Sequence, residues 1–185
     1  MRGRAILMSS ARSDWGTPAW LLSSLESELG QPFALDLAAR VDNKVAPLWV
    51  GPGSRYGENT LDLELPHRLL TELPPGLWGR WWFCNPPYGK DTLAWVQTWE
   101  RLVAHGARIV ALLPARTDTR WFHSFKPSFA TEIRLLQGRL QFVGAPSGAP
   151  FPSMLAFMAQ SVGTPAPELR ITRRTFHAPR ETSNP

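Results

Sequence analysis

The sequence has a single cysteine, only four histidines and no long apolar run. Cys84 alone forms neither an intramolecular disulfide nor a zinc site built from several thiolates. The histidines lie far apart and lack the spacing of metal ligands. No apolar stretch approaches the roughly 18 residues that cross a bilayer, and the apolar patch near the N-terminus is too short for a signal peptide. We therefore expect a cytoplasmic protein without a metal.

The length of 185 residues is enough for one domain with a sizeable core. Residues 1–90 are neutral overall, so the whole net charge of +5 lies in residues 91–185. A one-sided basic surface is typical of proteins that bind a polyanion such as nucleic acid. A solubilising surface explains so small an excess equally well. The nine tryptophans either pack in a core or stack on bases.

Composition divides the chain into three parts. Residues 1–12 are expected to be a flexible arm, and residues 13–160 a folded domain. Residues 161–185 form a basic tail rich in Pro, Thr and Arg, for which we expect no regular structure.

Within the folded domain, apolar periodicity predicts alternating helices and strands. Thr17 and Pro18 are typical of a helix N-cap followed by proline, and Gly30 ends that helix. A second helix follows Asp91 and ends at Gly106; its apolar face includes Trp95 and Trp99, which are expected to be core. The expected strands are 33–38, 81–84, 109–113, 132–136, 139–143 and 153–158. This alternation favours an α/β sheet.

Three polar clusters follow predicted strands. They are Asp36, Asn85 and the run Arg116-Thr117-Asp118. Ligands of α/β sheets bind at the carboxyl ends of the strands. We therefore expect one cleft in which these groups converge.

The segment Asn85-Pro86-Pro87-Tyr88 carries the most specific chemistry. Two prolines stop the preceding strand and stiffen the backbone. The Asn85 side-chain carbonyl and the Pro86 main-chain carbonyl are two acceptors that together can hold a planar amino group. They also stabilise the positive charge that develops when that amine is alkylated, and the Tyr88 ring can stack on a heterocycle. The alternative is a Pro-Pro turn that only ends a strand.

Six segments in order resemble the amino-methyltransferases of nucleic acid, and among them the phage-type DNA adenine-N6 methyltransferases. The resemblance runs from Ser13 to Met158. The segments are Ser13-Asp-Trp-Gly-Thr-Pro18, Leu35-Asp-Leu-Ala-Ala39, Phe83-Cys-Asn-Pro-Pro-Tyr-Gly89, Leu113-Pro-Ala-Arg-Thr-Asp-Thr-Arg-Trp-Phe-His123, Gly138-Arg-Leu-Gln-Phe142 and Ala149-Pro-Phe-Pro-Ser-Met154.

The resemblance implies a Rossmann-like sheet with helices on both faces, late antiparallel strands and S-adenosylmethionine as cofactor. The implied catalytic residues are Asn85, Pro86, Pro87 and Tyr88. The implied cofactor-binding residues are Trp15, Thr17, Pro18, Asp36, Ala38 and, placed loosely, Asp62. The segment Ala38-Ala39-Arg40 stands where many methyltransferases have a glycine-rich turn. The residue for the ribose hydroxyls stays open among Asp42, Asn43, Glu58 and Asn59.

The resemblance also implies double-stranded DNA as the partner. The candidate DNA contacts are Arg116, Thr117, Asp118, Arg120 and Arg139. A solvated loop with a local Asp–Arg pair is the alternative at the first four positions. A monomer suffices, because one methyl group goes to one strand at a time. The chain has no room for a large separate recognition domain, so we expect a short recognition sequence.

The predicted function is therefore transfer of a methyl group from S-adenosylmethionine to the N6 amine of adenine in DNA. One alternative is methylation of another amine, such as that of guanine or adenine in RNA or a protein glutamine amide. The other is a relative that binds DNA without turnover. The resemblance alone favours DNA over RNA.

Overall fold

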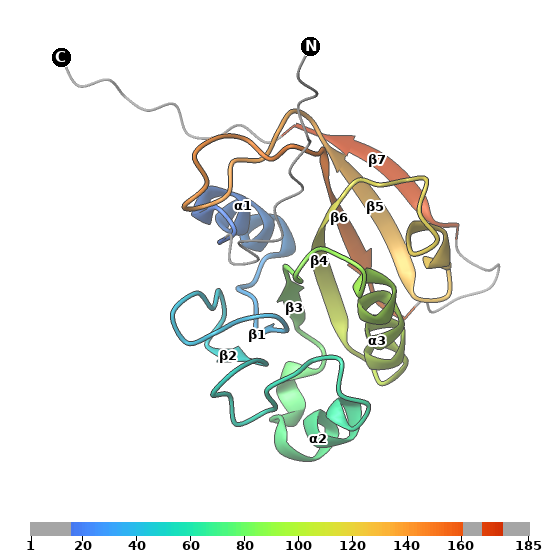
Figure 1. The fold of residues 1–185 in the computed structure, drawn as a ribbon. Coiled ribbons are helices and arrows are strands. Elements are labelled where there is room, and N and C mark those ends of the chain that lie inside the picture. Colours follow the sequence, from blue (N-terminus) through green and yellow to red (C-terminus); the bar gives the residue numbers. More distant parts are fainter. Residues whose placement is uncertain (1–15, 161–167, 176–185) are drawn as a thin grey trace, which may run out of the picture.

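The computed structural model describes residues 16–160 and 168–175, which form a sheet with helices on both faces (Figure 1). The expected arm at 1–12 and Trp15 lie outside the described residues. The helices are α1 (Ala19–Leu29), α2 (Leu65–Glu72) and α3 (Thr92–Ala104), with short 3₁₀ turns η1 (Pro75–Leu77) and η2 (Phe122–Ser124). The strands are β1 (Leu35–Asp36), β2 (Leu48–Trp49), β3 (Trp81–Cys84), β4 (Arg108–Pro114), β5 (Ala130–Leu136), β6 (Ser153–Met158) and β7 (Arg170–Arg174).

The seven strands form one sheet in the order β2-β1-β3-β4-β6-β5-β7. Their pairings make six strands parallel, and only β6 runs in the opposite direction, between β4 and β5. The parallel strands β1, β3 and β4 therefore end at the same edge of the sheet. This arrangement is Rossmann-like and confirms the expected α/β class with a late antiparallel strand.

The two faces of the sheet have separate apolar cores. On one face, α2 and α3 pack on Trp82, Ile109 and Ala156. On the other face, α1 and the loop after β5 pack on Phe83 and Val110. Successive residues of β3 and β4 alternate between the two cores, and both strands are buried throughout apart from Arg108. Burial on both faces explains why these strands are continuous apolar runs in the sequence.

The strand expected at residues 139–143 is wrong, because the structure has a loop there. Leu140 and Phe142 are buried and their neighbours are exposed, which gives the alternation of a strand without a ladder. The backbone bonds instead to two separate places: the Val143 amide donates to the Gly16 carbonyl, and the Leu140 carbonyl accepts from the Ala149 amide. Alternation of apolar and polar residues is therefore not sufficient to identify a strand in this segment.

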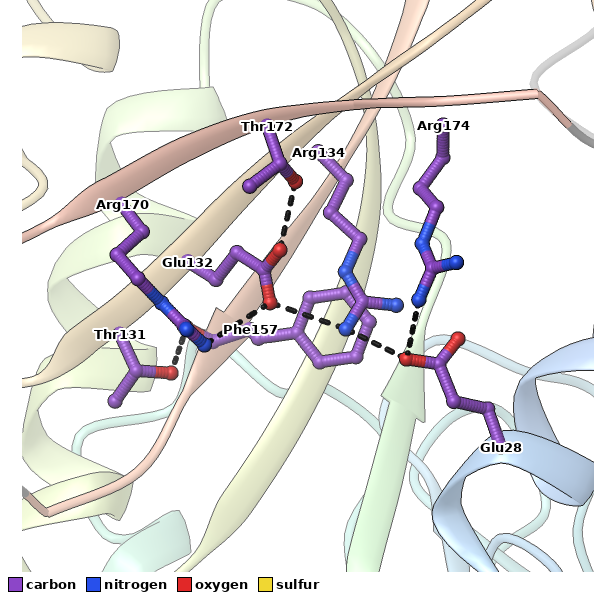
Figure 2. Close-up of polar contacts among 8 residues, drawn as sticks. All are labelled: Glu28, Thr131, Glu132, Arg134, Phe157, Arg170, Thr172 and Arg174. Atoms are coloured by element: carbon purple, nitrogen blue, oxygen red, sulfur yellow. Dashed lines mark hydrogen bonds and ion pairs between the residues drawn. The ribbon is translucent and has the colours of Figure 1, made fainter.

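The expectation of a tail without regular structure is wrong for β7, which pairs in parallel with β5 at the edge of the sheet. Figure 2 shows the charged side chains that attach it. Arg134 of β5 bonds Glu132 and Glu28 of α1 at 3.0 and 2.8 Å, and its guanidinium lies 3.9 Å from the ring centre of Phe157. Arg174 of β7 also bonds Glu28, at 3.0 Å. Part of the positive charge of the second half is thus paired internally.

Arg134 is expected to contribute most to this network, because its side chain is only 9% exposed. Arg134→Met keeps the apolar stem but leaves two carboxylates without their shared partner. We expect it to lower the free energy of unfolding by about 2 kcal/mol. Arg170→Met is the matched control, since Arg170 is 72% exposed and 3.7 Å from Glu132; its cost should stay below about 1 kcal/mol. Equal losses in urea unfolding would contradict a buried network centred on Arg134.

Candidate active site

A cavity of about 280 Å³ opens at the carboxyl ends of β1 and β3. Its walls come from five places in the chain: residues 16–17, 36–45, 50–60 and 83–87, and Trp95 of α3. Of the three polar clusters expected to converge, Asp36 and Asn85 do so in this cavity, whereas Arg116, Thr117 and Asp118 do not line it. Trp95 was expected to be core, and it is buried at 6% exposure while it also forms part of the cavity wall.

The loop after β1 uses its own backbone N–H groups internally. The amides of Leu37, Ala38 and Ala39 donate to the Phe83 carbonyl, the Asp36 Oδ1 and the Val50 carbonyl respectively. The Arg40 amide donates to Asn43 Oδ1 at 2.7 Å. A glycine-rich turn presents backbone N–H groups to a ligand, whereas this loop must contact a ligand through side chains and carbonyls.

Asp36 holds the shape of that loop from inside. It is 3% exposed, and its two oxygens accept the amides of Ala38 and Val45, each at 3.1 Å. Burial raises the pKa of the Asp36 carboxyl from its usual 3.8 to about 6, because the two hydrogen bonds offset only part of the desolvation. The carboxylate is thus ionised above about pH 6 and places a negative charge in the cavity wall.

This pKa shift predicts a pH-dependent stability. Between its unfolded value of 3.8 and about 6, the folded protein holds the Asp36 proton more tightly than the unfolded chain. The stabilisation from Asp36 is therefore largest below about pH 4 and is lost as the pH rises through 6. Relative to Asp36→Asn, we expect the wild-type free energy of unfolding to fall by about 2 kcal/mol from pH 4 to 7. A difference that is flat or rises with pH in urea titrations would disprove the shift.

Asn85 follows β3 directly, and both ends of its amide are bonded. Its Nδ2 donates to Thr17 Oγ1 at 3.3 Å, and its Oδ1 accepts the Tyr88 hydroxyl at 2.7 Å. Pro86 is buried and Pro87 is exposed, so the stiff Pro-Pro segment leads the chain out of the sheet. An amide carbonyl has two lone pairs, so Oδ1 can bond both Tyr88 and a substrate amine.

Tyr88 packs as part of an aromatic cluster. Its ring meets Phe151 and Phe142 edge to face, with centroid distances of 5.5 and 6.3 Å. Burial raises the pKa of the Tyr88 phenol well above its ordinary value, so the hydroxyl stays protonated and donates to Asn85. The residue is half-buried, so the hydroxyl orients Asn85 while part of the side chain remains at the surface.

The model of the DNA N-6-adenine-methyltransferase (Dam) family matches residues 5–181 of this chain. The chain belongs to the Dam methyltransferase family. No curated protein is detectably similar to it. A solved structure with a similar fold is a predicted O-methyltransferase, protein Atu636 from Agrobacterium tumefaciens, which is 16% identical, with 82% of each chain covered and a TM-score of 0.42.

The structure brings some of the family-implied cofactor residues of this Dam-family chain together and leaves others apart. Thr17, Asp36 and Ala38 line the cavity. Pro18 does not line the cavity. It follows Thr17 directly and is the N-cap residue of α1. Asp62 does not line the cavity; its carboxylate accepts the Glu64 amide and lies 3.6 Å from Arg68 at the start of α2. Trp15 lies outside the described residues.

Of the four ribose candidates, three line the cavity: Asn43, Glu58 and Asn59. Asp42 does not, and it pairs with Arg40 at 3.2 Å. Asn43 and Asn59 each use the side-chain carbonyl for a backbone amide of their own loop. Glu58 is the exposed carboxylate of the three. Glu58 is thus the one candidate that brings an exposed carboxylate to the cavity wall, which the sequence alone did not single out.

Gly51 is a wall residue that sequence reasoning missed. Its φ is +149°, and a Cβ placed on it would lie 1.8 Å from the Ala39 carbonyl oxygen. Gly51 therefore lets the chain after β2 approach the loop after β1 closely enough to form the cavity. The run Gly51-Pro52-Gly53 was the available signal, because glycine marks close backbone approach.

The candidate DNA contacts of this Dam-family protein lie in two loops. Arg116, Thr117, Asp118 and Arg120 are exposed in the loop after β4, at the same edge of the sheet as Asn85. Arg139 is in the loop after β5 and lines a separate groove of about 540 Å³ with Trp20. Within residues 16–160 and 168–175, no group of His, Cys, Asp and Glu could hold a metal ion. No helix in that same part of the chain is long and apolar enough to cross a membrane.

Proposed function

We propose that this protein transfers a methyl group from S-adenosylmethionine to the N6 amine of adenine in DNA. The observation that carries the proposal is Asn85 at the end of β3, in the wall of a cavity that also includes the buried carboxylate of Asp36. Membership of the Dam family supports DNA adenine as the acceptor.

The cavity fits the proposed cofactor. Its walls include the apolar side chains of Val45, Val50 and Pro52, which suit an adenine ring. Glu58 can accept the two ribose hydroxyls. The ionised Asp36 places a negative charge in the wall that attracts the ammonium group and the sulfonium of the cofactor, while its hydrogen bonds hold the loop after β1. When bound, S-adenosylmethionine supplies an electrophilic methyl group on a sulfonium sulfur.

The chain's own residues position the target amine. Asn85 Oδ1 and the Pro86 carbonyl accept its two hydrogens, which directs its lone pair toward the cavity. The same acceptors stabilise the cationic nitrogen that forms in the transition state. The nitrogen loses its proton after it becomes cationic, so no strong base is needed beside Asn85. Most of the rate enhancement comes from positioning.

Access to an adenine in duplex DNA requires that the base leave the stack, at a cost of a few kcal/mol. Stacking on Tyr88 returns about 1–3 kcal/mol of this. The exposed loop from Arg116 to Arg120 lies at the same edge of the sheet, where its side chains can bind phosphates or bases next to the extruded nucleotide. Arg139, on the loop after β5, is a second candidate contact in a separate groove.

The test is transfer of tritium from labelled S-adenosylmethionine to three acceptors: unmethylated duplex DNA, RNA and a mixture of proteins. We expect label in DNA alone. Label in RNA or in protein glutamine would replace adenine in DNA with one of the other amine substrates. Cofactor binding by calorimetry without transfer to any acceptor would indicate a DNA-binding relative without turnover.

A further inference from the structure

Thr17 was expected to cap α1, but its side chain has a different role in the structure. The N-cap position belongs to Pro18, and no side-chain hydrogen bond caps the helix. Thr17 is only 8% exposed. Its hydroxyl oxygen instead accepts Asn85 Nδ2 at 3.3 Å, across 68 positions of sequence. A buried threonine hydroxyl is therefore directed at the amide that holds the target amine.

The backbone around Thr17 is fixed on both sides. Gly16 forms a bridge to Val143, whose amide donates to the Gly16 carbonyl at 2.8 Å. A Cβ on Gly16 would lie 3.2 Å from the Val143 Cβ, so the two segments are in close contact. Pro18 then begins α1, and its carbonyl accepts the first helical amides. Thr17 is thus anchored to the rest of the fold independently of any ligand.

The two ends of the Asn85 amide have partners of opposite kind. Thr17 Oγ1 accepts from the amide nitrogen, and the Tyr88 hydroxyl donates to the amide oxygen. The protonated phenol of Tyr88 donates to Oδ1, and Thr17 Oγ1 accepts from Nδ2, so both ends of the amide are satisfied in this orientation. Together the two contacts hold the plane and direction of the amide.

We propose that Thr17 is a positioning residue that fixes the Asn85 amide with its oxygen toward the target amine. This inference rests on the proposed function. In the flipped amide an N–H₂ group would face the substrate N–H₂ group, so donor would meet donor and the acceptor pair would be lost. Thr17 thereby acts on turnover through Asn85, whereas a residue that only lines the cofactor cavity would act on cofactor affinity.

The kinetic test compares Thr17→Val, which removes the acceptor at nearly constant volume, with Thr17→Ser, which keeps it. We expect Thr17→Val to lower kcat about 10- to 100-fold with little change in KM for S-adenosylmethionine. Thr17→Ser should recover most of the rate. Thr71→Val on the exposed face of α2 controls for the substitution itself. A raised KM with kcat intact would overturn the proposal, as would equal rates for Val and Ser.

A readout independent of activity uses the side-chain amides. The chain has four asparagines, so selective ¹⁵N-asparagine labelling gives four resolvable NH₂ pairs at most. Loss of the acceptor in Thr17→Val should move the Asn85 pair upfield and speed its exchange with water, and Thr17→Ala should do the same if Val fails to fold. An unmoved Asn85 pair would overturn the inference even in an active enzyme. If the wild-type protein is inactive but the Asn85 pair shifts in Thr17→Val as expected, the proposed function is rejected and the contact between Thr17 and Asn85 is retained.

Discussion

Asn85→Ala is expected to lower methyl transfer by about two to three orders of magnitude while S-adenosylmethionine still binds. Asn85 Oδ1 is one of the two acceptors that hold the amine, and it stabilises charge that exists only in the transition state. Removal of one such preorganised group lowers kcat about 10²- to 10³-fold. Most residues of the cavity wall lie elsewhere, on the loops after β1 and β2, so the dissociation constant of the cofactor should change little. Single-turnover kinetics and calorimetry measure the two effects separately.

Asn59→Ala is the matched control for this substitution. Asn59 also lines the cavity, but it lies on the loop after β2, away from Asn85 in the chain. We expect its loss to weaken cofactor binding more than it slows the bound enzyme. Full activity in Asn85→Ala would contradict the role of Asn85 in holding the target amine. The same changes in kcat and cofactor affinity in both variants would contradict it as well.

Gly51→Ala is expected to cost about 4 kcal/mol of stability and to close the cavity. A Cβ at Gly51 would lie 1.8 Å from the Ala39 carbonyl oxygen, and a backbone atom cannot move aside as a flexible side chain does. The penalty combines overpacking of about 1–3 kcal/mol with an unfavourable φ of about 1–3 kcal/mol. Because Gly51 and Ala39 are both wall residues, cofactor affinity should fall with stability.

Gly53→Ala separates the clash from the dihedral angle. Gly53 also has a positive φ, of +79°, but nothing lies within 4 Å of a Cβ placed there. It should cost only about 1 kcal/mol and leave the cavity unchanged. Thermal unfolding and cofactor titration of both variants measure this difference. Similar losses at the two glycines would show that close approach to Ala39 does not shape the cavity.

The sequence predicted the elements whose physical causes are local. The strand at Trp81–Cys84 is apolar throughout and is stopped by two prolines, so both its extent and the position of Asn85 could be predicted. β1 was likewise expected, and the burial of Asp36 at its end follows from its place in the sheet. These features bring Asp36 and Asn85 to one cavity because strand ends in a parallel sheet meet at one edge.

The features that were missed depend on contacts between distant segments. Residues 170–174 are mostly polar and basic, and they become an edge strand by pairing in parallel with β5, with ion pairs to Glu28 and Glu132 beside the ladder. Thr17 stands before a proline and a helix, where the sequence predicts an N-cap. Only the fold shows that its hydroxyl contacts Asn85 instead. Asp62 was assigned to the cofactor site by resemblance alone. In the structure its carboxylate accepts the Glu64 amide just before α2 and lies near Arg68. Periodicity and composition carry no information about such partners.

Identification of the methylated atom tests the central claim most directly. Unmethylated duplex DNA is incubated with the protein and labelled S-adenosylmethionine, digested to nucleosides and separated by chromatography with mass detection. The Asn85–Pro86 acceptor pair predicts label in N6-methyl-2′-deoxyadenosine, formed about 10²- to 10³-fold more slowly with Asn85→Ala. Label on cytosine, or on any carbon atom of a base, would contradict the account.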